Sequence, residues 1–235
     1  MNPIVFSHKG KRENNQDFVL KERINSEFDL FLIADGMGGY QNGEIAARIV
    51  AESILAYLST IKKVNEKEIQ RAINKANLAI KQKVHDTGTK MGATVGGVII
   101  NDNQAYGFWV GDVMIFHFNN KKLQFESSSH TLINNIKKNG SLKSSEYISK
   151  YRHIVTKSIQ GEISYSTIDY LEFGRMTEDD FIIICSDGVH DIINGIELEN
   201  IFSLNISLKE SVKKIEQRCL AESSDNFSMI LIQII

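Results

Sequence analysis

The chain has 235 residues, 42% of them hydrophobic, and a formal net charge of -2 at pH 7, which predicts a single domain over residues 1–235. With so small a net charge, no overall electrostatic field points to nucleic acid or an anionic membrane, and neither is expected as a partner. No apolar run reaches the roughly 18 residues of a membrane span and no signal peptide is evident. With Cys185 and Cys219 standing apart in apolar contexts, a reduced, cytoplasmic protein is expected.

The first predicted element is a strand over residues 29–34, which ends in Asp35-Gly36 and a glycine-rich loop. Asp-Gly often makes a hairpin turn between two strands. Here, however, the apolar residues that follow recur at helical spacing, which predicts a helix over residues 43–60. The loop matches neither the dinucleotide-binding pattern nor the P-loop pattern. The carboxylate of Asp35 is therefore the feature that we expect this loop to serve.

A second helix is predicted to begin at Asn65, because Glu68 stands three residues later as in a capping box. A third is predicted from Ser207, where Glu210 completes a similar box. Further apolar runs predict strands over residues 94–100, 105–110, 113–118, 122–126, 180–185 and 228–234. Clustered strands with tight turns favour antiparallel pairing, and segregated helices favour an α+β fold over a doubly wound α/β sheet.

Acidic residues directly adjoin several of these apolar strands. They are Asp35, Asp112, Asp187 with the nearby Asp191, and Asp225, while Arg12 and Asp17 lie near the start of the chain. Each alone is an ordinary turn residue, but strand ends that meet at one edge would bring them together. Clustered like charges must be neutralised, and oxygen ligands favour Mg²⁺, Mn²⁺ or Ca²⁺. With a guanidinium suited to phosphate, the set predicts metal-assisted phosphoryl hydrolysis.

Six motifs extend this prediction. In chain order they are "KRENNQD", "ADGMGG", "MGATV", "VGDVMIF", "CSDGVHD" and "SDNFS". In this order they resemble the motifs of the metal-dependent protein phosphatases, the PPM family of type 2C, and of its bacterial members in particular. The resemblance spans residues 12–228. It implies a four-layer αββα sandwich of two antiparallel β-sheets flanked by helices, with a flap segment at about residues 130–160.

The resemblance also implies a role for each matching residue. Asp35 matches the carboxylate that bridges two Mn²⁺ or Mg²⁺ ions, and the carbonyl of Gly36 matches a ligand of one of them. Asp187 and Asp225 match ligands of the other ion.

Four further residues match positions around these two ions. Arg12 matches the arginine that binds the substrate phosphate, and Asp17 matches an acidic residue that holds metal-bound water. Asp112 and Asp191 resemble residues that, with Asp187, form a weaker third metal site in bacterial members.

Several positions depart from the family pattern. They are Gln16, Met37, Ser129 and Met114, the last of which belongs to a "GDVM" stretch where the family usually has "GDSR". Because Met37 stands where animal members tend to have a histidine, no general acid is evident there. His130 is expected to be a structural residue, and Cys185 is expected to be an inert core thiol.

The implied activity is hydrolysis of phosphoserine and phosphothreonine in proteins by a metal-activated water at a binuclear centre. Phosphorylated proteins are the expected partners, including a Ser/Thr kinase or its targets, and the basic segment 137–157 is expected to attract them. Two alternatives remain open. One is a catalytically weak relative that binds phosphorylated partners as a regulator or scaffold, and the other is a phosphohydrolase for small molecules. The complete set of Asp35, Asp187 and Asp225 favours activity.

Overall fold

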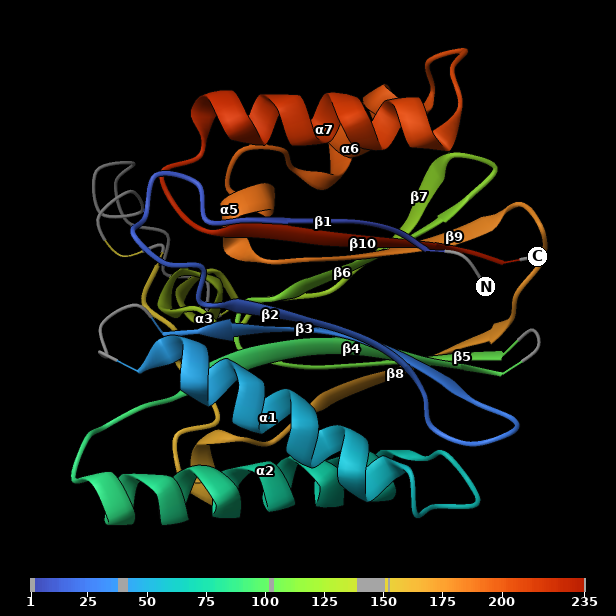
Figure 1. Ribbon diagram of the computed structural model, residues 1–235. Coiled ribbons are helices and arrows are strands. Elements are labelled where there is room, and N and C mark those ends of the chain that lie inside the picture. The colour runs from blue at the N-terminus through green and yellow to red at the C-terminus, as the bar shows by residue number, and fades with distance from the viewer. Residues whose placement is uncertain (1–2, 38–41, 102–103, 139–150, 152, 235) are drawn as a thin grey trace.

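Two antiparallel β-sheets stacked face to face form the centre of the molecule (Figure 1). The structure is a computed structural model and describes residues 3–37, 42–101, 104–138, 151 and 153–234. Within these residues each sheet has five strands, and helices cover the outer faces of both sheets. The predicted α+β class and four-layer sandwich are therefore confirmed. None of the helices in the described residues is long and apolar enough to span a bilayer.

The first sheet carries helices α1 (Gly43–Leu58) and α2 (Glu66–Thr87) on its outer face. Along its strand β3, Leu30 and Leu32 pack toward these helices, whereas Phe31 and Ile33 face the other sheet. Because both faces of the strand are buried, its sequence is one continuous apolar run. The strands of this sheet are, in spatial order, β2 (Asp17–Arg23), β3 (Asp29–Gly36), β4 (Ala93–Asn101), β5 (Gln104–Val110) and β8 (Asp169–Arg175).

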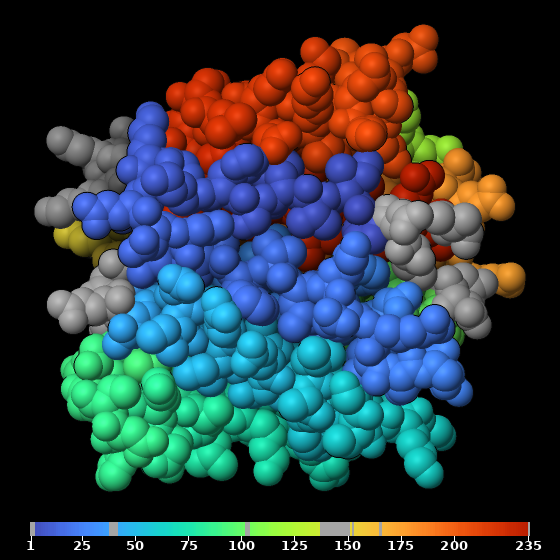
Figure 2. All heavy atoms as spheres, in the orientation of Figure 1, coloured from blue at the N-terminus to red at the C-terminus, as the bar shows by residue number. Residues whose placement is uncertain are grey.

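The second sheet is covered by α6 (Gly195–Phe202) and α7 (Leu208–Glu222), and the short helix α5 (Asp187–His190) also lies on this side. The rings of Phe118 and Phe181 stack at 4.9 Å in this layer. In the space-filling view, the N-terminal segment crosses the middle of the visible face, between α7 and the α1–α2 layer (Figure 2). The strands are, in spatial order, β1 (Ile4–His8), β10 (Phe227–Gln233), β9 (Asp180–Cys185), β6 (Met114–Asn119) and β7 (Lys122–Glu126).

The predicted helix starts are confirmed at two caps. The side chain of Asn65 accepts a hydrogen bond from the backbone of Glu68 at 3.0 Å, and Ser207 and Glu210 form a reciprocal capping box at the start of α7. Three strands, β1, β2 and β8, were not predicted. Each lies at an edge of its sheet, where a strand is less deeply buried and its apolar pattern is weak.

The predicted flap at about residues 130–160 is described only in part. Helix α3 (Leu132–Lys138) lies within it, and the 3₁₀ helix η1 (Ile163–Tyr165) follows it. Residues 139–150 and 152, which include most of the predicted basic segment, lie outside the described residues.

Candidate active site

Most of the predicted site residues line one cavity of about 940 Å³, where strands β3 and β9 end and strands β4 and β10 begin. In the described part of its wall, carboxylates outnumber the single guanidinium, so negative charge dominates this space. The site residues on the wall are Arg12, Asp35, Gly36, Asp112, Asp187 and Asp225.

Strand β3 delivers Asp35 and Gly36 to the cavity. The N–H of Gly36 donates to the carbonyl of Gln16 at 3.1 Å, which fixes the strand end against the loop before β2. A Cβ atom at Gly36 would lie 2.2 Å from the carbonyl oxygen of Gly43. The close approach of α1 therefore explains why glycine follows Asp35. The next part of the predicted glycine-rich loop, residues 38–41, lies outside the described residues.

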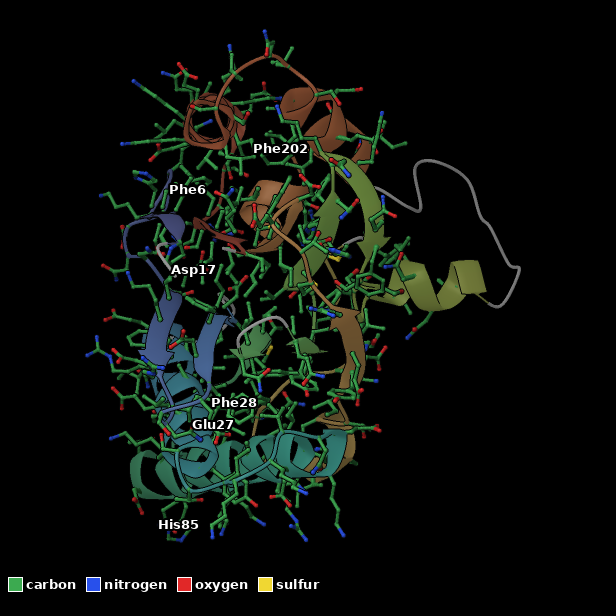
Figure 3. All side chains as sticks on the ribbon, turned by 90° about the vertical axis from the view of Figure 1, so that its right-hand side faces the viewer. Phe6, Asp17, Glu27, Phe28, His85 and Phe202 are labelled. Atoms are coloured by element: carbon green, nitrogen blue, oxygen red, sulfur yellow. The ribbon has the colours of Figure 1, made fainter. Side chains whose placement is uncertain are left out.

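Asp17 lies beside this strand end but is not among the described residues that line the cavity. It is 8% exposed, and Figure 3 shows it at a height between Phe6, on strand β1, and Phe28, which directly precedes strand β3. Its Oδ2 accepts a hydrogen bond from the hydroxyl of Ser186 at 2.7 Å. Ser186 directly precedes Asp187, so the second predicted Asp-Gly turn is tied to the first sheet.

Arg12 is held at the cavity by Asp225. Its Nη2 donates to Oδ2 of Asp225 at 2.7 Å. This hydrogen bond, together with the negative charge of Asp225, raises the pKa of Arg12. Because 52% of the arginine side chain is exposed, its other N–H groups remain within reach of a ligand in the cavity.

Asp112 and Asp191 lie in two connecting segments near the cavity. Asp112 occupies the turn between β5 and β6 and is 6% exposed, and its carbonyl lies 2.9 Å from Nε2 of His190. Asp191 directly follows α5, and its carboxylate lies 3.4 Å from Nδ1 of His153 and 3.7 Å from Nδ1 of His190. Asp191 is not among the described lining residues, whereas His153 is.

The carboxylates of the site disfavour one another's charge. Desolvation, followed by the charges of neighbouring aspartates, raises the pKa values of Asp35 and Asp187 well above the ordinary range. Desolvation also raises the pKa of Asp17 to about 6 and raises the pKa of Asp112. Such a cluster is stable in its charged form only with cations close by.

The donor set fits a hard divalent cation. Carboxylate oxygens dominate it, and one oxygen of Asp17 is buried with no hydrogen-bond partner among the described residues. Oxygen-rich, anionic sites of this kind are typical for Mg²⁺ and Mn²⁺. Among the described residues, no three His, Cys, Asp or Glu side chains form a ready-made metal-binding group, so the ligand roles remain predictions.

Sequence reasoning missed the structural role of Asn226. Its Nδ2 donates to the carbonyls of Lys9 and Asn14 at 2.8 Å each, and its Oδ1 accepts from the N–H of Gln16 at 2.9 Å. The loop that carries Arg12 and the start of β10 are therefore one hydrogen-bonded unit. The signal was available in the motif "SDNFS", where Asn226 directly follows a predicted ligand.

The wall formed by residues 153–160 was also missed. It contributes His153, Val155, Thr156, Ser158 and Gln160 to the cavity. The sequence predicts that most of this stretch belongs to a basic flap, whereas its lining side chains are mostly uncharged.

The fold is shared with solved bacterial phosphatases. A crystal structure of a bacterial serine phosphatase superposes with a TM-score of 0.89 at 21% identity, covering 100% of this chain and 98% of that one. The serine/threonine phosphatase PstP/Ppp of Mycobacterium tuberculosis gives a TM-score of 0.83 at 22% identity, covering 99% and 98%. The chain therefore shares its architecture with these phosphatases.

The chain belongs to the protein phosphatase 2C family. The sequence model described as Protein phosphatase 2C matches residues 6–229. Protein phosphatase PhpP of Streptococcus pneumoniae is 30% identical over 238 residues, covering 95% of this chain and 93% of that protein. This family is metal-dependent, and the chain is a 2C-type serine/threonine protein phosphatase. The predicted resemblance and enzyme class are confirmed.

Proposed function

We propose that the cavity is a binuclear Mn²⁺ or Mg²⁺ centre at which this phosphatase hydrolyses phosphoserine and phosphothreonine in proteins. The supporting observation is the convergence of Asp35, Asp187 and Asp225 with the guanidinium of Arg12 on one cavity. Carboxylate oxygens would hold the ions, and the arginine would hold a phosphoryl group.

Asp35 would serve both ions, the carbonyl of Gly36 would contribute to one of them, and Asp187 and Asp225 would hold the other. When bound, such ions lower the pKa of water and neutralise the oxygens of a phosphoryl group. The unfavourable burial of Asp35 and Asp187, seen in their raised pKa values, supports this assignment because cations would remove it.

Asp112 and Asp191, with Asp187, are the proposed ligands of a weaker third ion. Burial is the main cause of the raised pKa of Asp112, and the nearby charge of Asp191 adds to it. Asp17 has a different proposed role. Ser186 holds one of its oxygens, so the other, which has no hydrogen-bond partner among the described residues, would orient metal-bound water.

Arg12 is the proposed phosphate-binding residue. A guanidinium presents its N–H donors in a planar fork that matches two phosphoryl oxygens at once. One donor bonds to Asp225 at 2.7 Å, which orients the group. The remaining donors would bind substrate and stabilise the charge that builds up on the phosphoryl oxygens.

Phosphorylated proteins are the substrates that the family implies. We further propose that they include a Ser/Thr kinase or its targets, because hydrolysis by this enzyme would reverse the reaction of such a kinase. The cytoplasmic location expected from the sequence stays a prediction.

The decisive experiment compares a phosphothreonine peptide with a small aryl phosphate, each with Mn²⁺, with Mg²⁺ and with chelator. Turnover of both substrates that disappears with chelator is the expected result. Metal binding without turnover of either substrate would support a scaffold instead. Turnover of the aryl phosphate alone would indicate a small-molecule phosphohydrolase.

A further inference from the structure

We propose that His130 is a positioning residue of this phosphatase, which holds the turn that carries Asp112. The inference rests on the proposed function for the role of Asp112. His130 is 5% exposed and is not among the described residues that line the cavity. It therefore acts through other residues, and its contacts identify them.

The first contact is a pair of hydrogen bonds to Gly111, the residue before Asp112. The backbone N–H of Gly111 donates to the ring atom Nδ1 of His130 at 2.9 Å. In return, the backbone N–H of His130 donates to the carbonyl of Gly111 at 2.7 Å. Gly111 has φ of +107°, and a Cβ atom there would lie 2.2 Å from Cβ of Thr94. Glycine can adopt this positive φ without a steric penalty, but it does not prefer this conformation over others. The two hydrogen bonds hold Gly111 in this conformation. They thereby fix the orientation of the next residue, Asp112.

The second contact fixes the ring itself. Because Nδ1 accepts a hydrogen bond, the neutral imidazole carries its proton on Nε2. Nε2 lies 3.2 Å from Oδ1 of Asp169 and 3.3 Å from Nζ of Lys157, and this lysine donates to the same carboxylate at 3.1 Å. A carboxylate behind a histidine holds its tautomer and orientation. Asp169 therefore keeps Nδ1 turned toward Gly111.

The third contact joins the same residue to the cavity wall. The carbonyl of His130 accepts from the backbone N–H of Thr156 at 2.7 Å and from its hydroxyl at 3.0 Å. Thr131 pairs with Val155 in an isolated β-bridge. Since Val155 and Thr156 line the cavity, His130 holds the turn of Asp112 through its ring and its backbone N–H, and it holds the wall through its backbone carbonyl. Only the ring contacts are lost when the side chain is changed.

Two substitutions separate these roles. His130→Ala removes the acceptor for Gly111. His130→Asn places an amide oxygen near the position of Nδ1, so it retains that acceptor. The matched control is His117→Ala, because His117 is also a largely buried histidine paired with an aspartate, Asp180, at 2.6 Å, and it does not line the cavity.

The measurement is calorimetric binding of Mn²⁺ to each folded, metal-free protein. We expect His130→Ala to weaken at least one Mn²⁺ binding step about tenfold, the lower end of the effect of removing an orienting partner. His130→Asn is expected to restore most of the affinity, and His117→Ala to leave it unchanged. Hydrogen exchange at the Gly111 amide is expected to be faster in His130→Ala than in His130→Asn, which tests the contact without metal.

Wild-type Mn²⁺ affinity in His130→Ala would overturn the positioning role, as would an equal loss in His117→Ala. If His130→Ala does not fold, unchanged Mn²⁺ affinity in Asp169→Asn together with fast exchange at Gly111 in the wild type would also overturn it. Assays of the wild type on a phosphothreonine peptide run alongside. A wild type that binds Mn²⁺ without turnover would refute the proposed function, whereas the positioning role is decided by the binding and exchange data alone.

Discussion

Asp17 and Asp35 lie directly opposite each other on the antiparallel strands β2 and β3, at the end of the sheet that reaches the cavity. Facing residues on such strands project to the same side with Cβ atoms about 5 Å apart, and like charges there are destabilising. Ser186 stabilises one oxygen of Asp17. The remaining repulsion is the physical basis of the first two predictions.

Replacing Asp35 by asparagine is expected to stabilise the metal-free protein by about 1 kcal/mol, because it removes one of the repelling charges. The same substitution is expected to weaken Mn²⁺ binding and abolish turnover, since a neutral amide is a poor ligand for two cations. Urea unfolding in chelator measures the first effect and calorimetry the second. Asp29→Asn is the control: Asp29 lies at the other end of β3, 4.0 Å from Arg23, and an exposed pair of this kind contributes little. Undiminished Mn²⁺ affinity in Asp35→Asn would contradict the two-ion role.

The stability of the metal-free protein is expected to fall as pH rises from about 4 to about 6. Desolvation raises the pKa of folded Asp17 to about 6, compared with roughly 3.9 in an unfolded chain. Between these values the folded protein binds more protons than the unfolded chain, so the free energy of unfolding decreases with pH. Asp17→Asn should make the decline shallower in urea unfolding curves recorded across this range. An equally steep decline in the variant would assign the titration to other groups.

Asp180, at the opposite end of β9, is expected to show the reverse dependence. Desolvation acts to raise its pKa, but hydrogen bonds from Thr177 and from His117 outweigh this effect and lower the pKa overall. The stabilisation is present above the unfolded pKa of roughly 3.9 and is lost as pH falls through the lower folded value. Asp180→Asn should therefore cost about 1 to 3 kcal/mol at neutral pH and less in acid. At a temperature at which the Asp180→Asn variant is folded, its kcat/KM should equal that of the wild type. A clear loss of kcat/KM under these conditions would argue against a purely structural role for Asp180.

Arg12→Ala is expected to lower kcat/KM for a phosphothreonine peptide by about tenfold to a hundredfold, since hydrogen bonds from a charged donor are worth roughly 1.5 to 3 kcal/mol. Arg12→Lys should recover part of the loss because it keeps the charge without the fork. The arginine occupies an oxygen of Asp225 at 2.7 Å, so its removal should leave Mn²⁺ affinity undiminished. Arg23→Ala, which changes an exposed arginine on β2, is the control. A marked loss of Mn²⁺ binding in Arg12→Ala would show that the arginine orders Asp225 instead.

The acidic turns could be located from the sequence because each adjoins a strand that is buried on both faces. Asp35 and Asp187 follow β3 and β9, and Asp225 precedes β10, so long apolar runs marked these strand ends. The six-motif resemblance then supplied the family and the sandwich fold. The ligand roles of these residues remain predictions, which the substitutions above test.

Other features could not be predicted, for two physical reasons. The edge strands β1, β2 and β8 lack the strong apolar pattern on which a strand prediction depends. The contacts of His130 with Gly111 and of Asn226 with Gln16 are hydrogen bonds between side chains and backbone across loops. No local periodicity encodes such bonds, because they depend on how distant turns are brought together.

The pairing of β1 with β10 determines when the enzyme can first become active during its synthesis. Arg12 and Asp225 are 213 residues apart and meet only once β10 has been made and has inserted between β1 and β9. At roughly 5 to 20 residues per second, Asp225 leaves the ribosome about ten to forty seconds after Asp35. A growing chain therefore carries no complete site until strand β10 has joined the second sheet.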